Sequence, residues 1–226
     1  MPTHVVFLHG ALGCSAHWQR FITEAGNNIV MHTPDLPGHG QSTETLENYN
    51  TETLAQWVDT YAKNNIEGRY HLVGYSMGGY IALQMLKDGY KNIASVTALA
   101  TKLNWSPTIA AEECSRLTLE SLTPILDKLK QEHGIHYEQL LPVTRQILTA
   151  IGENPLQASY FANNTCPVKL LLGERDKMVT QEETIAFAKA AKSFSVEILP
   201  AQPHLLERME TSPVMDTWQR FLQNIQ

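Results

Sequence analysis

The sequence predicts an α/β fold, with a mostly parallel central sheet of about six strands, helices on both faces and a helical insertion. Short apolar runs alternate with helix-length amphipathic segments, as expected for strand–helix–strand units. The runs are apolar on both faces, which is typical of strands buried within a parallel sheet. One long stretch between two of these runs contains only helical patterns, and it therefore indicates an insertion.

The expected strands are short, apolar and rich in β-branched residues, and most of them end shortly before glycine or proline. In chain order they are Val5–Leu8, Ile29–Met31, His71–Val73, Ala94–Ala100, Val168–Leu172 and Phe194–Leu199. Parallel neighbours need a crossover connection between them, and the helical segments supply it.

The segments between the strands carry apolar residues at helical spacing. One such stripe predicts a helix over Thr51–Asn64, and its members are Leu54, Trp57, Val58 and Tyr61. The other helices expected beside the sheet are Ser15–Ala25, Met77–Asp88, Gln181–Ala191 and Val214–Ile225.

Residues 103–166 break this alternation, and we interpret them as a helical cap inserted into a core of residues 1–102 and 167–226. Helices are expected over Thr108–Leu119, Thr123–Glu132, Gln139–Ile151 and Pro155–Phe161, with prolines near their starts at Pro107, Pro124, Pro142 and Pro155. His133 and His136 are expected to face water. Five apolar residues either pack on the core or line an acyl pocket: Leu117, Leu119, Leu122, Ile125 and Leu129.

Composition narrows the range of partners. The 226 residues carry a formal net charge of −6 and no long basic run, so no nucleic-acid partner is expected. No apolar stretch is long enough for a membrane span, and no signal peptide is recognisable. The three cysteines form neither a CxxC pair nor a four-ligand zinc spacing, which favours a reducing, cytoplasmic location. A small-molecule substrate is the expected partner, and the oligomeric state stays open.

The clearest chemical signal is Gly74-Tyr75-Ser76-Met77-Gly78, which lies between an expected strand and an expected helix. A serine at the tip of such a sharp turn needs strained backbone angles and close passage of the chain on either side. A β-carbon at position 74 or 78 would collide, so glycine is needed at both. Ser76 is therefore predicted to be a nucleophile. The alternative is a glycine-rich turn that contains a serine by chance.

Two backbone N–H groups are predicted to stabilise the negative oxygen of a tetrahedral intermediate. One belongs to Met77, directly after the serine, and the other to Ala11, in the loop that follows the first strand. His9, in the same loop, is interpreted as a structural residue that hydrogen-bonds the loop into shape.

A carboxylate and a histidine are expected at the ends of later strands, where ligands bind in such sheets. Asp176 follows the strand Val168–Leu172, and His204 follows the last strand, in the order that this architecture uses. Glu174 is the main alternative to Asp176, and Asp35 is interpreted as a turn-former. His204 is favoured over the other histidines by its position; His32, His39 and His71 are interpreted as core or loop residues.

These motifs together resemble the α/β-hydrolase superfamily. The resemblance covers His9-Gly10, the run from Asp35 to Ser42, Gly74 to Gly79, Gly173 to Asp176, and His204. It is strongest toward small carboxylesterases of the pimeloyl-carrier-protein methyl ester esterase type and toward the menaquinone-pathway succinyl-hydroxy-cyclohexadiene-carboxylate synthase. The synthase pattern has arginine directly after its glycine pair, whereas this chain has Tyr80.

The resemblance implies a serine hydrolase that cleaves a small-molecule carboxylic ester or thioester through an acyl-enzyme on Ser76, with no metal or organic cofactor. A first alternative is a lyase like the synthase, which needs cations facing Ser76; the candidates are Arg116, Arg145 and Arg175. A second alternative is a non-catalytic small-molecule receptor on the same fold.

Overall fold

A computed structural model describes residues 2–24, 28–189 and 191–225. Six strands form one parallel sheet in the order β2-β1-β3-β4-β5-β6. They are β1 Thr3–Leu8, β2 Ile29–His32, β3 Tyr70–Tyr75, β4 Ile93–Leu99, β5 Val168–Gly173 and β6 Phe194–Leu199. All six expected strands are therefore confirmed, and their ends differ from the predicted ends by at most two residues.

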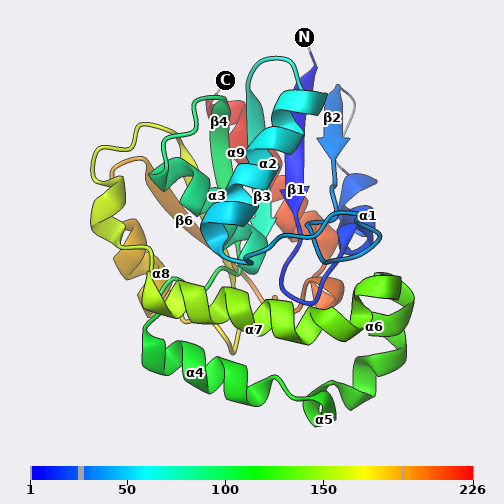
Figure 1. Cartoon of the computed structure of the whole chain (residues 1–226). Helices are drawn as coiled ribbons and strands as arrows, with labels where there is room; N and C mark the ends of the chain where they lie inside the picture. The colour runs from blue at the N-terminus through cyan, green and yellow to red at the C-terminus, as the bar shows by residue number, and fades with distance from the viewer. Residues whose placement is uncertain (1, 25–27, 190, 226) are drawn as a thin grey trace.

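Helices cover both faces of the sheet, as predicted. On one face the core is formed with α2 Thr51–Asn65, α3 Met77–Lys87 and α8 Gln181–Ala188. On the other face it is formed with the short helices η1 Ser15–Trp18 and α1 Gln19–Ile22 and with α9 Thr211–Ile225. Figure 1 shows α2 and α3 in front of the sheet and α9 behind it. The central strands β1, β3, β4 and β5 are largely hidden from water on both sides, which explains their nearly continuous apolar character, whereas the edge strands β2 and β6 are partly exposed.

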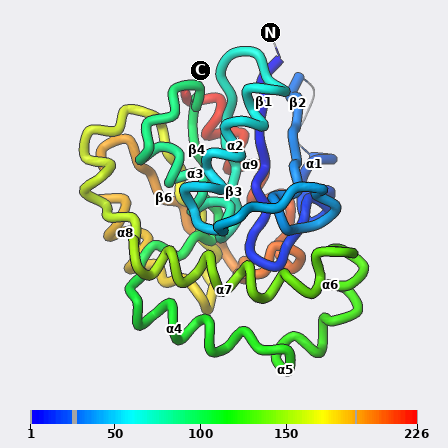
Figure 2. The backbone as a smooth tube through the Cα atoms, viewed as in Figure 1, coloured from blue at the N-terminus to red at the C-terminus, as the bar shows by residue number. Residues whose placement is uncertain are grey.

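The regular elements within residues 103–166 are all helices. They are α4 Pro107–Arg116, α5 Leu119–Leu122, η2 Thr123–Ile125, α6 Leu126–His133, η3 Gly134–His136, α7 Tyr137–Glu153 and η4 Ala158–Phe161. In the tube view, α4, α6 and α7 run across the end of the sheet at which β1 and β3 finish (Figure 2). This segment therefore lies over the carboxyl ends of the strands, where the site residues were expected.

Several helix boundaries differ from the prediction. The helix expected over Thr108–Leu119 is interrupted, because Thr118 is extended and caps α5 by accepting a hydrogen bond from Ser121 N–H. Pro142 is the sixth residue of α7, since that helix continues directly from η3 and begins earlier than expected. The helix expected over Pro155–Phe161 is only the short η4.

Two of the helices beside the sheet are also shorter than predicted. The helix expected over Ser15–Ala25 ends at Ile22, and Ala25 lies outside the described residues. The helix expected over Gln181–Ala191 ends at Ala188, and position 190 also lies outside them. No helix in the described ranges is both long and apolar enough to cross a membrane.

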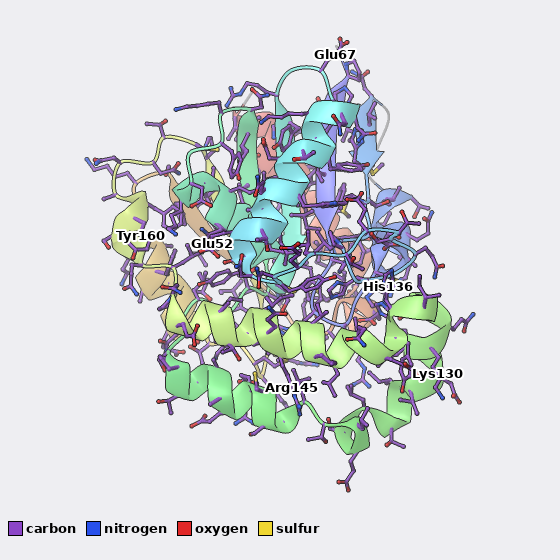
Figure 3. All side chains as sticks on the ribbon, viewed as in Figure 1. Glu52, Glu67, Lys130, His136, Arg145 and Tyr160 are labelled. Carbon is purple, nitrogen blue, oxygen red and sulfur yellow. The ribbon has the colours of Figure 1, made fainter. Side chains whose placement is uncertain are left out.

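The expectation that His133 and His136 face water is wrong. Both side chains are buried, and both rings form hydrogen bonds to loops of the sheet domain that lie more than ninety residues earlier in the chain. Nδ1 of His133 accepts from Gly40 N–H at 2.9 Å, and its Nε2 donates to the Leu12 carbonyl at 3.2 Å. His136 donates to the Ser42 carbonyl, and Figure 3 shows it at the loop side of the helical segment.

Candidate functional site

Ser76 sits in a strained turn between β3 and α3. Its backbone has φ +50° and ψ −113°, a conformation that non-glycine residues rarely adopt. Ser76 N–H donates to the Leu99 carbonyl at 2.8 Å, which fixes the turn to the end of β4. A β-carbon on Gly74 would lie 2.3 Å from the Gly78 backbone, and one on Gly78 would lie 2.3 Å from the Leu8 carbonyl oxygen. Both glycines are therefore required by close backbone packing.

The loop after β1 lies directly beside this turn. A β-carbon on Gly10 would lie 2.7 Å from the Tyr75 ring and 3.4 Å from Cβ of Ser76. Ala11 is the next residue in the loop, and Met77 is the first residue of α3. Within the described part of the chain, neither of their N–H groups donates a hydrogen bond. Both donors are thus available near Ser76, as a developing oxyanion requires.

His9 has a structural environment. Its ring is fully buried, its Nε2 accepts from Leu36 N–H at 3.0 Å, and its Nδ1 donates to the Gly10 carbonyl at 2.9 Å. Burial lowers the pKa of His9 to about 4, so the ring is neutral near pH 7. Both ring nitrogens are used within the loops, in agreement with the structural interpretation.

The structure brings Asp176 and His204 together. Nδ1 of His204 donates to Oδ2 of Asp176 at 2.7 Å, and the Asp176 side chain has no exposed surface. The other carboxylate oxygen accepts from the N–H groups of Met178 and Val179 at 2.8 and 2.9 Å. Three donors therefore hold the carboxylate in place. This geometry selects the histidine tautomer that is protonated at Nδ1 and leaves a lone pair on Nε2.

The two rival carboxylates have other partners. Oε2 of Glu174 accepts from Ala201 N–H at 2.8 Å, and the residue is exposed. Asp35 accepts from Ser15 N–H at 2.6 Å and from Gln41 N–H at 2.8 Å, so it organises the loop that follows β2. Neither carboxylate bonds to His204 in the described residues.

His204 lies beside the serine turn without bonding to the serine. Its ring centroid is 5.6 Å from that of Tyr75, the residue before Ser76. Among the described residues, no hydrogen bond joins Ser76 Oγ to the His204 ring. Catalytic hydrogen bonds are often long in the absence of substrate and shorten in the reacting complex.

The remaining candidate histidines have structural partners. His71 on β3 pairs through Nδ1 with the Ser95 hydroxyl at 2.7 Å. His32 on β2 lies against His4 of β1, with ring nitrogens 3.1 Å apart. His39 is buried against His9, with ring centroids 5.1 Å apart.

Tyr80 occupies the position at which the synthase pattern has arginine. Its hydroxyl accepts from Leu156 N–H at 2.7 Å in the buried core, and burial raises the pKa of Tyr80 to about 12. The candidate arginines are exposed. Arg116 pairs with Glu113 at 3.1 Å, and Arg145 bonds from α7 to the Leu117 carbonyl (Figure 3). These contacts hold both guanidinium groups within the helical segment.

An apolar hollow of about 350 Å³ lies between α5, α6 and α7. Its lining includes Leu119, Leu122 and Leu129 but neither Leu117 nor Ile125. Leu12, which follows Ala11 in the chain, packs against the same leucine cluster. The hollow is therefore linked by direct contact to the loop beside Ser76.

One group of polar side chains was not predicted. Cys14, His17 and Glu132 place their sulfur, nitrogen and oxygen atoms within 4.8 Å of one another. The pair Cys14-x-x-His17 was a possible signal, because two ligand-type residues three positions apart share one face of a helical turn. The third member comes from another part of the chain, which spacing does not reveal.

Comparison with known proteins agrees with this architecture. The profile of the α/β hydrolase fold family matches residues 3–133 of the 226. A pimeloyl-[acyl-carrier protein] methyl ester esterase from Proteus mirabilis is 32% identical over 112 residues, which cover 49% of this chain and 40% of that protein. A 2-succinyl-6-hydroxy-2,4-cyclohexadiene-1-carboxylate synthase from Photorhabdus laumondii is 26% identical over 205 residues, or 76% of this chain and 70% of that protein.

The crystal structure of NosK from Streptomyces actuosus superposes with a TM-score of 0.86 at 17% identity, over 100% of this chain and 99% of that one. At this identity the likeness concerns the fold. The alignment with the Proteus mirabilis esterase spans about two-fifths of that protein's length. The profile match covers more than half of the chain, and the sheet order and the turn at Ser76 agree with it, so the chain belongs to the α/β hydrolase fold family.

Proposed function

We propose that this protein is a serine hydrolase that cleaves a carboxylic ester or thioester of a small molecule. The main support is the 2.7 Å hydrogen bond from His204 to the fully buried carboxylate of Asp176, beside the strained turn that carries Ser76. A buried carboxylate that orients a histidine next to a serine is the arrangement used for nucleophilic acyl transfer. The esterase relatives support the same reaction class.

In the proposed mechanism, Nε2 of His204 takes the proton of Ser76 Oγ as the oxygen attacks the acyl carbonyl. Asp176 fixes the tautomer of the ring and stabilises the imidazolium that forms. His204 then gives the proton to the leaving alcohol or thiol, and Ser76 is left as an ester. A water molecule attacks this acyl-enzyme with His204 again as base, which releases the acid and restores the serine.

The negative oxygen of each tetrahedral intermediate is proposed to be bound by the N–H groups of Ala11 and Met77. Ala11 follows Gly10, which lies against the serine turn, and Met77 directly follows Ser76. These positions, and the lack of other acceptors for the two N–H groups among the described residues, support this role. Residues 103–166 are proposed to act as a cap over this site. The chemistry uses side chains and backbone alone and requires no metal or organic cofactor.

The second candidate function is an elimination or carbon–carbon bond cleavage of the synthase type. The similarity to the Photorhabdus laumondii synthase over most of both chains favours it. Tyr80 argues against it, because a buried phenol bonded to Leu156 N–H provides no fixed cation for a carboxylated substrate. A receptor without catalysis is the third candidate, and an available Ser76, Asp176 and His204 argue against it.

The test is labelling with a fluorophosphonate, together with hydrolysis of p-nitrophenyl acetate, butyrate and octanoate. Ser76→Ala and His204→Ala serve as controls. Labelling of Ser76 with ester turnover that both variants lose supports the hydrolase. Labelling without turnover points to the synthase-type reaction, to be tried with its dicarboxylate substrate. A wild-type protein that neither labels nor turns over esters would be a receptor.

A further inference from the structure

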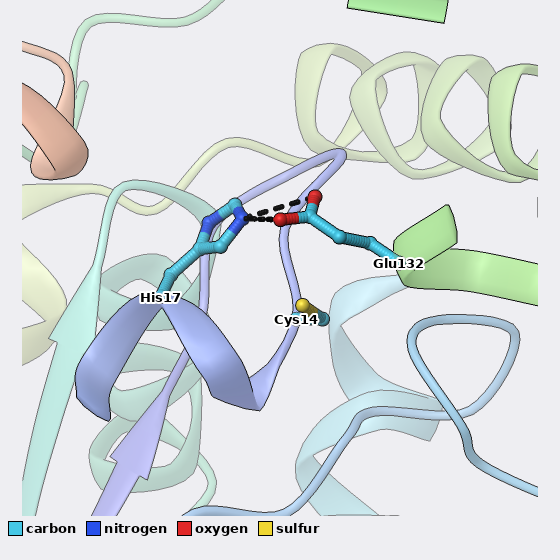
Figure 4. Close-up of side chains that lie close together, drawn as sticks. All are labelled: Cys14, His17 and Glu132. Atoms are coloured by element: carbon cyan, nitrogen blue, oxygen red, sulfur yellow. Dashed lines mark hydrogen bonds and ion pairs between the residues drawn. The ribbon is translucent and has the colours of Figure 1, made fainter. Parts of the chain in front are cut away.

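A compact cluster of potential metal ligands joins the loop after β1 to α6 (Figure 4). Cys14 is the residue before η1, His17 lies within η1, and Glu132 is the penultimate residue of α6. Nε2 of His17 lies 3.2 Å from each carboxylate oxygen of Glu132. Cys14 is only 4% exposed, and the side chains of His17 and Glu132 are 10% and 18% exposed. The cluster is therefore largely shielded from water.

The spacing of these atoms suits a small divalent ion. Zinc binds nitrogen and carboxylate oxygen at about 2.0–2.1 Å, so two such ligands at the tetrahedral angle lie about 3.3 Å apart. The observed distance between His17 Nε2 and the Glu132 oxygens is 3.2 Å. The Cys14 sulfur lies within 4.8 Å of both groups. A zinc-bound thiolate lies about 3.6 Å from its neighbouring ligand atoms, so the sulfur needs to approach by at most about 1.2 Å.

The surrounding charges are compatible with an ion. Oε1 of Glu207 lies 3.6 Å from Nε2 of His17 and supplies a possible fourth ligand. The Lys128 ammonium lies 2.7 Å from Glu207 and 3.7 Å from Glu132. Two carboxylates and a thiolate together carry three negative charges. These balance the two positive charges of a divalent ion and the one of this ammonium group. A mixed sulfur, nitrogen and oxygen set selects borderline-soft ions over calcium or magnesium.

We propose that Cys14, His17 and Glu132 form a binding site for one transition-metal ion of the zinc class, with Glu207 or water as the fourth ligand. Binding uses the thiolate of Cys14 and the His17 tautomer protonated at Nδ1, so the thiol proton is released to solvent. The ion would tie the loop that carries Ala11 to α6 and to η5 Leu206–Arg208. Its role is to stabilise this junction, and the acyl-transfer chemistry proceeds without it.

The experiment uses full-length protein that has been treated with a chelator and dialysed, and it adds Zn²⁺ or Co²⁺. One equivalent of Co²⁺ is expected to produce a thiolate-to-metal charge-transfer band, and saturating Zn²⁺ is expected to raise the Tm by about 5–10 °C. Cys14→Ser should abolish the band, and His17→Gln should weaken Zn²⁺ binding at least about tenfold in competition with a chromophoric chelator.

Matched controls come from the other two cysteines, since Cys114→Ser and Cys166→Ser are expected to leave the band and the affinity unchanged. The proposal is overturned if Co²⁺ gives the same spectrum with Cys14→Ser as with the wild type. It is also overturned if Zn²⁺ leaves the wild-type Tm unchanged, or if less than half an equivalent binds. Folding of each variant is checked by its circular dichroism before metal is added, so that loss of structure is distinguished from loss of a ligand.

Discussion

Nδ1 of His204 lies 2.7 Å from Oδ2 of Asp176, and the carboxylate's other oxygen is held by two backbone N–H groups. Glu174, only two residues earlier, turns away and accepts from Ala201 N–H. The loop after β5 therefore presents one carboxylate to the histidine and uses the other to brace the loop after β6. This difference separates two residues that the sequence alone leaves as rivals.

Substitution of the two carboxylates tests this difference. Asp176→Asn is expected to reduce kcat for p-nitrophenyl ester hydrolysis roughly 1,000-fold or more, because an amide favours the wrong histidine tautomer. Glu174→Gln keeps an oxygen for Ala201 N–H and should change kcat less than about threefold. Steady-state kinetics of both purified variants give the comparison. Equal losses in the two variants would contradict the assignment of Asp176.

Gly78 offers a test of the close packing around the serine turn. A β-carbon there would lie 2.3 Å from the Leu8 carbonyl oxygen, and a backbone atom shifts less easily than the end of a flexible side chain. Gly78→Ala is therefore expected to lower the free energy of unfolding by at least about 3 kcal/mol, as measured by urea denaturation.

Gly68→Ala is the matched control for this substitution. Gly68 has φ +90° but open space around it, so alanine there should cost only about 1–2 kcal/mol through backbone strain. If Gly78→Ala is as stable as Gly68→Ala, the packing described for the turn is incorrect.

Tyr80 is expected to contribute to stability through one buried hydrogen bond. Tyr80→Phe leaves Leu156 N–H without its acceptor inside the core, which should cost about 1–3 kcal/mol and lower the Tm by about 2–10 °C. Tyr160→Phe removes a hydroxyl from an exposed ring and should leave the Tm within about 1 °C. Thermal denaturation measures the Tm of both variants. A Tm loss of the same size in both would contradict this role of Tyr80.

The sequence predicted the sheet well because each strand carries its signal locally. Apolar, β-branched runs such as Val168–Leu172 need both faces buried, whatever surrounds them. The turn at Ser76 was also predictable, since the need for glycine at positions 74 and 78 arises from the turn itself. Asp176 was predicted as the partner of His204, but spacing alone left Glu174 as an alternative, because the two carboxylates differ mainly in how the folded loops orient them.

The buried histidines show where local patterns fail. His133 lies near the end of a polar helix, and its sequence neighbours indicate exposure. Its burial depends on Gly40 and Leu12, which approach it only after the helical segment packs on the core. The cluster of His17 with Glu132 depends on the same packing. Contacts of this kind join residues more than ninety positions apart, so the periodicity of a single sequence does not predict them.

His9 is expected to make the protein less stable in acid. Its pKa is lowered by burial to about 4, whereas the unfolded chain titrates near the ordinary value of 6.5. Above pH 6.5 the ring is neutral in both states, and its contribution to stability is fully present. As the pH falls from 6.5 toward 4, the unfolded state takes up the proton first, so the free energy of unfolding decreases by up to about 3 kcal/mol.

Burial also lowers the pKa values of His39 and His133, so these two residues likewise decrease the free energy of unfolding as the pH falls. Urea denaturation at several pH values between about 7.5 and 5 measures the slope, in a range where most carboxylates stay ionised. His9→Gln retains an acceptor for Leu36 N–H. The variant should lose the part of the pH dependence that the titration of His9 contributes, whether or not its free energy of unfolding at pH 7.5 is lower. A wild-type stability that stays constant over this range would mean that His9 accepts a proton in the folded state, against its burial and its two hydrogen bonds.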